Sequence, residues 1–404
     1  MSFREIFCQD KAIDILQRAF ALGKWAHAYI FAGPEGVGKF KTACEWAKLL
    51  LCQNPIGDRR QSTGCLTAKT EDRNQSRDER RETSIEHRVS SIEYRADSCG
   101  SCRACQLFEA GSHPDFNHIY KELREFTKDG KGKPPPVDLP IDVIREFLIE
   151  KVSTRPTLSQ RKVFVLSEAE RLNAASQNAL LKVLEEPPEY CSIILLCTRL
   201  EKLLPTTKSR SQIIRFGPIA EERIIEKLQQ VDIEEKKARY FARLAQGSLG
   251  TAQQWAELEL AEANLYKTKK GLVNSLADYE IADALSLAQK LLEKSKEIAG
   301  VWTNLDKATS KTDINRRAAK TLVRIIISAL YDAMNLNVSP AKEVINFDQK
   351  EQIKKLAGRF DAELSAEKIS GCYKLLHWIE SSVNEKLIFE KLLLNLAESD
   401  KMRV

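Results

Sequence analysis

Residues 33 to 40 read Gly-Pro-Glu-Gly-Val-Gly-Lys-Phe, and this stretch decides the fold of the first half of the chain. It follows a short apolar run at residues 28 to 32 and leads into a helical pattern, which is the strand, Gly-rich loop and helix order of a phosphate-binding loop. The glycines let backbone N–H groups turn toward phosphate oxygens, and the lysine adds a point charge at the β- and γ-phosphates. The predicted nucleotide-binding residues of this loop are Gly33, Gly36, Gly38 and Lys39.

One position of the loop departs from the usual pattern. The residue after the lysine is normally Ser or Thr, whose hydroxyl holds Mg²⁺, whereas here it is Phe40, which cannot bind a metal. The alternative interpretation is a Gly-rich turn before a core helix, with Phe40 as a core residue. We favour a phosphate-binding loop that has lost its metal ligand, because later motifs complete a nucleotide-site pattern.

The composition is typical of a soluble globular protein with two or three domains. The chain has 404 residues, of which 43% are hydrophobic and 30% charged, and its formal net charge is +6. This charge permits contact with nucleic acid but does not require it. No apolar run approaches the roughly 20 residues of a membrane span, and the first residues lack a signal-peptide pattern, so we expect a cytoplasmic protein with no membrane partner. Its ten cysteines are then expected to be reduced thiols or metal ligands.

Three cysteines recur at successive x₂ spacings between positions 99 and 105, in a segment with few apolar neighbours. Thiolates at this spacing wrap a tetrahedral Zn²⁺ well. A fourth ligand is needed, and the cysteine at the end of the helix after the loop is the first candidate, with Cys65 and His113 as alternatives. We expect a structural zinc, because four thiolates leave no open position for catalysis. The predicted ligands, in a zinc module over residues 52–105, are Cys52, Cys99, Cys102 and Cys105.

The stretch inside this module has a different character. Residues 57 to 96 are rich in charged, Ser and Thr residues, including the run Arg77-Asp78-Glu79-Arg80-Arg81-Glu82, and leave almost nothing to bury. Low hydrophobicity and dense charge are typical of disordered segments. We therefore predict an insertion that loops out of the zinc module.

A second nucleotide-site motif follows the apolar, β-branched run at residues 161 to 166. In such sites an acidic residue at the strand tip holds Mg²⁺, and the next acid polarises the attacking water. Here the metal-holding position is Ser167 and the next residue is Glu168. The metal contact is thus lost at two positions far apart in the sequence, Phe40 and Ser167, and we predict that the chain does not hydrolyse ATP itself.

Apolar runs alternate with helical patterns up to residue 217, which predicts a parallel α/β sheet. The predicted strands cover residues 28–32, 116–120, 161–166, 193–197 and 213–216. Thr198 ends the fourth of these strands, where a polar residue that senses bound nucleotide would lie. From Pro218 on we find no convincing strand and expect helices. The predicted domains are an α/β domain at 1–217, a small helical domain at 218–260 and a helical domain at 261–404.

Several longer motifs complete the pattern. They are the stretch from Trp25 to Lys39, the cysteine module, the run Gln177-Asn178-Ala179-Leu180-Leu181-Lys182-Val183-Leu184-Glu185-Glu186-Pro187-Pro188, and Leu204-Pro205-Thr206 followed by Ser209-Arg210. Together they resemble the AAA+ clamp-loader subunits of bacterial DNA polymerase III. The resemblance covers about residues 5 to 217 and is faint beyond, apart from residues 383 to 390. It implies an AAA+ phosphate-loop domain with a zinc module, a small helical lid and an all-α collar.

The resemblance also implies partners. Such a chain sits in a hetero-pentamer with gamma/tau and delta subunits and helps to load the sliding clamp on primer–template DNA during DNA replication. Within the family it is closer to delta-prime subunits, which often have a degraded nucleotide site, than to the gamma/tau motor. The resemblance implies that Arg210 is an arginine finger that reaches the ATP site of a neighbouring gamma/tau subunit. Ser211 replaces the usual cysteine after this arginine, and Gly250 stands where a sensor arginine could contact ATP.

Two other functions fit parts of the sequence. The first is an active gamma/tau-like ATPase, in which water or Thr42 replaces the missing metal ligands; Thr42 lies two residues beyond Phe40 and points elsewhere on the helix. The second is a stand-alone, zinc-stabilised DNA-binding module, which would need a basic stripe, although the helices mix both charge signs. Mg²⁺-dependent turnover would favour the first, and salt-sensitive DNA binding the second.

Overall fold

The computed structural model describes residues 2–57, 96–128, 138–307, 309–339, 343–381 and 383–397. The predicted insertion at 57–96, with Cys65, lies almost entirely outside these residues. The chain divides into two compact units, Met1–Gly217 and Pro218–Val404. The further division of the second unit into a lid and a collar stays a prediction.

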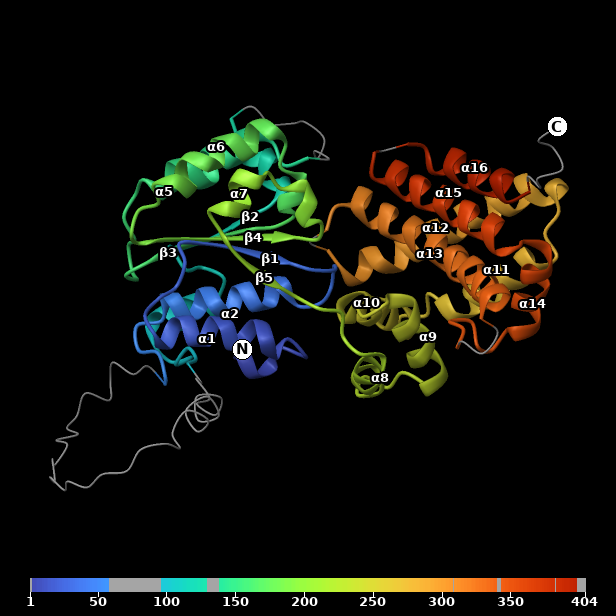
Figure 1. The fold of residues 1–404 in the computed structure, drawn as a ribbon, viewed down its shortest axis with the longest axis horizontal. Coiled ribbons are helices and arrows are strands. Elements are labelled where there is room, and N and C mark those ends of the chain that lie inside the picture. Colours follow the sequence, from blue (N-terminus) through green and yellow to red (C-terminus); the bar gives the residue numbers. More distant parts are fainter. Residues whose placement is uncertain are drawn as a thin grey trace, which may run out of the picture. The chain divides into compact units, whose positions relative to one another are not determined.

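The first unit contains a five-stranded parallel sheet (Figure 1) with the strand order β2-β3-β4-β1-β5. Its strands are β1 (Ala28–Ala32), β2 (Phe116–Ile119), β3 (Lys162–Leu166), β4 (Cys191–Cys197) and β5 (Gln212–Arg215). This confirms the predicted parallel α/β fold. Strands β1, β3 and β4 are buried along their whole length, as is typical of strands covered on both faces. Since the strands are parallel, the segments that follow their carboxyl ends gather at one edge of the sheet.

Two helical layers cover the sheet, with α1 and α2 on one face and α5 and α6 on the other (Figure 1). Alternate residues of β1 enter different cores, because successive side chains of a strand point to opposite faces. Tyr29 and Phe31 pack in the same cluster as Trp46 of α2, whereas Ile30 packs in the same cluster as Leu180 of α6. The helices of this unit are α1 (Asp10–Ala21), α2 (Lys39–Leu51), α3 (Arg103–Glu109), α4 (Ile141–Ile144), α5 (Glu150–Val152), α6 (Ala174–Glu185) and α7 (Pro205–Ser209). The 3-10 segments are η1 (Phe3–Glu5), η4 (Lys121–Phe126), η6 (Ala169–Arg171) and η7 (Leu200–Lys202), and the π segment η5 (Arg145–Ile149) joins α4 to α5.

The second unit is helical throughout its described residues, as the sequence predicts. Its longest helix, α13, packs against α12, α14 and α15. The elements are α8 (Glu221–Gln229), α9 (Glu235–Ala245), α10 (Leu249–Leu260), α11 (Leu265–Ala277), η8 (Ile281–Asp283), α12 (Ala284–Leu305), α13 (Lys311–Val338), α14 (Lys350–Arg359), α15 (Ala362–Glu380) and α16 (Glu385–Ala397). Among the described residues, no helix combines the length and apolarity needed to cross a membrane.

Candidate functional site

The predicted phosphate-binding loop lies between β1 and α2. Gly38 adopts φ +101° just before the helix, a conformation that L side chains rarely adopt. A Cβ on Gly33 would lie 2.4 Å from the backbone oxygen of Phe216, so the close passage of the neighbouring segment requires a glycine there. Gly36 likewise has a positive φ of 71°. Backbone geometry therefore explains all three predicted glycines without reference to a ligand.

Lys39 is almost buried, with 9% of its surface exposed. Its Nζ donates a hydrogen bond of 2.7 Å to the Gly33 carbonyl oxygen and another to the carbonyl oxygen of Pro34. Burial lowers the pKa of Lys39, and the nearby carboxylates of Glu170 and Glu35 oppose that shift. The loop thus holds its cation beside two acidic side chains, which disfavour a polyanion at this position.

The two positions that would hold Mg²⁺ are linked by a residue that the sequence analysis did not single out. The ring centroids of Phe40 and His118 lie 4.7 Å apart, and Nε2 of His118 lies 2.9 Å from Oγ of Ser167. Burial lowers the pKa of His118 to about 4, so its imidazole is neutral at pH 7. Mg²⁺ prefers a near-octahedral set of oxygen ligands. A phenyl ring, an imidazole and one hydroxyl do not fit that preference.

His118 could not be placed from the sequence, because its neighbour was unknown. It lies near the carboxyl end of β2, and β2 pairs with β3 so that Ile119 is opposite Leu166, the residue before Ser167. A histidine near the end of an edge strand is a weak signal by itself. The strand order brings it to the predicted nucleotide site.

Glu168 and Thr198, both predicted site residues, lie after the ends of β3 and β4 and contact other parts of the same chain. Glu168 adopts φ +53°, and its carboxylate forms ion pairs with Arg171 at 3.0 Å and Lys121 at 3.9 Å. Burial raises the pKa of Glu168, and these two cations oppose the shift. Thr198 donates a hydrogen bond to Glu170. The acid that would polarise water is therefore already held by two cations.

Arg210 follows the short helix α7 and has 36% of its side chain exposed. Its guanidinium lies 2.9 Å from Oε1 of Glu185 at the end of α6, and Nη1 donates to the carbonyl oxygen of Thr206 at 3.2 Å. Gln177 of α6 fixes the approach to α7, since its Oε1 accepts a hydrogen bond of 2.8 Å from the backbone N–H of Leu204. The Gln177 to Glu185 part of the sequence motif thus supports the segment that presents the arginine.

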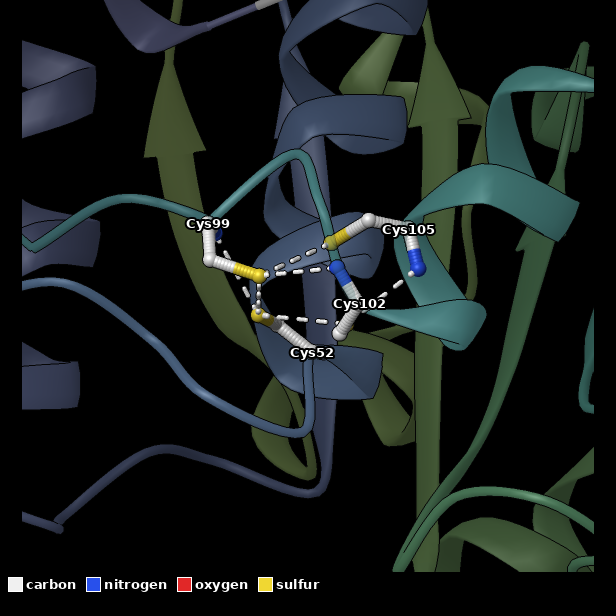
Figure 2. A group of neighbouring side chains, drawn as sticks. All are labelled: Cys52, Cys99, Cys102 and Cys105. Atoms are coloured by element: carbon white, nitrogen blue, oxygen red, sulfur yellow. Dashed lines mark hydrogen bonds between the residues drawn. The ribbon is translucent and has the colours of Figure 1, made fainter.

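A second cluster joins the end of α2 to the start of α3. Figure 2 shows the side chains of Cys52, Cys99, Cys102 and Cys105 gathered together, and their sulfur atoms all lie within 4.8 Å of each other. Cys52 is 3.5 Å from Cys99 and 4.0 Å from Cys102, and Cys99 is 3.9 Å from Cys105. Sulfurs in a tetrahedral zinc centre with bonds of about 2.3 Å lie about 3.8 Å apart. The set is therefore compatible with zinc.

Backbone N–H groups support the charge that zinc ligands need. The N–H of Cys102 lies 3.3 Å from Sγ of Cys99, and the N–H of Cys99 lies 3.3 Å from Sγ of Cys52. Burial by itself would raise the pKa of Cys99, but donors from Cys102 and Ser101 lower it to about 6. A thiolate stabilised in this way is the form that binds a metal.

His113, the alternative fourth ligand, is not part of the cluster. Its Nδ1 accepts the N–H of Asp115 at 3.1 Å, and its Nε2 lies 3.2 Å from Oγ of Ser159. Cys52 instead completes the four-thiol group. The other alternative, Cys65, lies outside the described residues.

Comparisons with known proteins place this geometry in context. A family model described as "DNA polymerase III, delta subunit" matches residues 8–93 and 74–220, and one described as "DNA polymerase III, delta subunit, C terminal" matches residues 307–398. The chain is 34% identical to DNA polymerase III subunit delta' of Pseudomonas aeruginosa over 185 residues, which are 46% of this chain and 41% of that relative. It is 26% identical to DNA polymerase III subunit tau of Bacillus subtilis over 320 residues, which are 74% of this chain and 47% of that relative.

A crystal structure of a DNA polymerase III gamma subunit-related protein from Thermotoga maritima aligns with 96% of this chain and 98% of its own, at 17% identity and a TM-score of 0.37. The chain matches less than half the length of either curated relative. Subunits of the delta' and tau types are both among the similar proteins, so similarity alone does not distinguish between these two types.

Proposed function

The chain belongs to the DNA polymerase III delta subunit family, and from this we propose that it is a delta-prime-like subunit of a clamp loader. In this role it assembles with gamma/tau and delta subunits and helps to place the sliding clamp on primer–template DNA. It does not turn over ATP itself. It supplies Arg210 to the ATP site of the neighbouring gamma/tau subunit.

The observation that carries the proposal is the link between Phe40 and Ser167 through His118. The distances of 4.7 Å between rings and 2.9 Å between Nε2 and Oγ put a neutral imidazole between the two positions that would bind Mg²⁺. Phosphoryl transfer depends on a metal that bridges the phosphates and neutralises developing charge. A site with this substitution lacks its main electrostatic catalyst.

The surroundings of the loop support the same conclusion. Glu168 is paired with two cations, so activating a water molecule would require breaking those contacts. Glu170 and Glu35 lie near Lys39, where they weaken the attraction of the loop for a triphosphate. Any nucleotide held by Gly33, Gly36, Gly38 and Lys39 would therefore have a structural role.

The position of Arg210 supports action on a neighbouring subunit. Its side chain is partly exposed at the end of α7. A guanidinium offers a planar set of donors that matches phosphate oxygens, and an arginine finger is worth about 10³ or more in rate. The chain would thus raise the turnover of a partner while having none of its own.

The four-cysteine cluster would hold a structural Zn²⁺ through Cys52, Cys99, Cys102 and Cys105. Four thiolates fill the tetrahedral coordination shell, so the metal has no open position for substrate. The ion would tie the end of α2 to the start of α3. The zinc would therefore stabilise the fold and take no part in the reaction.

ATP turnover by the purified chain, with Mg²⁺, tests the proposal against the gamma/tau-like motor. We expect turnover no higher than that of Lys39→Ala, which removes the loop cation. Turnover that depends on both Lys39 and Mg²⁺ would overturn the proposal and support the motor. A parallel titration with primer–template DNA at two salt concentrations tests whether the lone chain is instead a DNA-binding module.

A further inference from the structure

We propose that Glu185 is a positioning residue that holds Arg210 in the free chain and must release it when the arginine engages a neighbouring γ-phosphate. This inference rests on the proposed function, because it takes Arg210 to be the arginine finger. It adds a residue to the mechanism and makes engagement of the finger a competition between two anions.

The geometry of the pair is specific. Glu185 is the last residue of α6 and Arg210 follows the last residue of α7, so two helix ends bring the side chains together. Nη2 of Arg210 lies 2.9 Å from Oε1 of Glu185. Nη1 donates to the carbonyl oxygen of Thr206 at 3.2 Å and to Oγ of Ser209 at 3.5 Å. The guanidinium is thus held on two sides, by one charged and two neutral acceptors.

These acceptors differ in whether they can stay in contact with Arg210 when its guanidinium binds a phosphate. The neutral oxygens of Thr206 and Ser209 can keep their bonds to Nη1 while other N–H groups of the guanidinium face a phosphate. The Glu185 carboxylate cannot remain in contact without bringing a negative charge close to the phosphate oxygens, which is unfavourable. Release of Glu185 is therefore the step that engagement requires.

The solvent exposure of Glu185 and Arg210 sets the strength of their ion pair. The two side chains are 36% and 48% exposed, so solvent screens much of their attraction. Exposed ion pairs of this kind typically change an equilibrium by roughly two- to fivefold. A restraint of that size keeps the finger in place in the free chain, and the stronger, charge-assisted contacts to a γ-phosphate can overcome it.

The test uses the assembled complex. Purified chain is titrated into fixed amounts of gamma/tau and delta subunits, and ATP turnover is measured with Mg²⁺ and primer–template DNA. Wild type is compared with Glu185→Gln, which removes the charge and keeps the shape. Glu186→Gln is the matched control, because Glu186 is the next residue, is also exposed, and forms no ion pair among the described residues. Both glutamine variants are also made with Arg210→Ala.

We expect Glu185→Gln to raise the ratio of maximal rate to half-saturating concentration roughly two- to fivefold. Glu186→Gln should leave it unchanged, and Glu185→Gln should have no effect when Arg210 is alanine, because the two residues act as one pair. If Arg210→Ala slows the complex but Glu185→Gln changes nothing or slows it, the restraint is wrong and the arginine finger stands. If Arg210→Ala has no effect, the finger and the restraint both fail.

Discussion

Removing a ligand from the cysteine cluster should destabilise the first unit by an amount that the chain topology sets. Cys52 and Cys99 are 47 positions apart, so a metal that joins them closes a long loop. On the loop-entropy relation used for cross-links, a closure of this length is worth about 4 kcal/mol. We therefore expect Cys102→Ser, or chelation of the metal, to lower the unfolding free energy of this unit by about 4 kcal/mol.

Two measurements check this prediction. Zinc content by mass spectrometry should fall from one equivalent to none in Cys102→Ser. Denaturant unfolding followed by circular dichroism should show one transition that shifts on chelation and recovers when zinc is added back. Cys8→Ser is the control, because Cys8 is a half-buried free thiol outside the cluster and its loss should change stability by less than about 1 kcal/mol.

The reasoning would be refuted by a wild-type protein that carries no zinc, or by a variant that keeps its zinc and its stability. A loss of zinc without any shift in unfolding would show instead that the cluster binds metal but that the link between α2 and α3 adds nothing to the fold.

Three further predictions concern the first unit. The double substitution Phe40→Thr and Ser167→Asp restores both metal ligands, so calorimetry should detect nucleotide binding that depends on Mg²⁺. Nucleotide binding of equal affinity with and without Mg²⁺ would contradict our account of the lost metal site. Burial lowers the pKa of His118 from 6.5 to about 4. Between these pH values the imidazole is protonated in the unfolded chain but not in the folded one, so the free energy of unfolding should fall by up to about 3 kcal/mol as the pH drops from 6.5 to 4. In His118→Gln this part of the pH dependence of the unfolding free energy should disappear. The same pH dependence in the variant and the wild type would be evidence against the role of His118. Asp115 is fully buried and accepts hydrogen bonds from the backbone N–H groups of residues 157–159. Asp115→Ala should therefore lower the free energy of unfolding, measured with denaturant, by about 4 kcal/mol. A loss below about 1 kcal/mol would show that these hydrogen bonds add little to stability.

The sequence predicts the three central strands β1, β3 and β4 well, because each has a short, largely apolar run that is buried along its whole length. The run predicted at residues 28–32 is β1, and the one predicted at 193–197 extends by two residues at its start to give β4. Central parallel strands are buried on both faces, so their sequences carry a strong and local signal. The helical character of the second unit is equally visible from periodic apolar faces.

The contacts across the site could not be predicted, because they depend on the order of strands and on helix ends. His118 meets Ser167 only because β2 is the edge strand beside β3. Glu185 meets Arg210 because α6 and α7 end near one another, 25 residues apart in the chain. Nothing in the local sequence around these residues marks the pairs. The sequence therefore indicates which metal ligands are missing, and the structure shows which side chain lies between their positions.

The measurement that tests the central claim most directly is ATP turnover by the complex of this chain with gamma/tau and delta subunits, compared for wild type, Arg210→Ala and Arg215→Ala. Arg215 is an exposed arginine on β5 and provides the same change of charge nearby. Our account predicts that Arg210→Ala lowers turnover by about 10³ at the site it serves, with assembly intact, and that Arg215→Ala has little effect. Equal turnover with alanine or arginine at position 210 would contradict it.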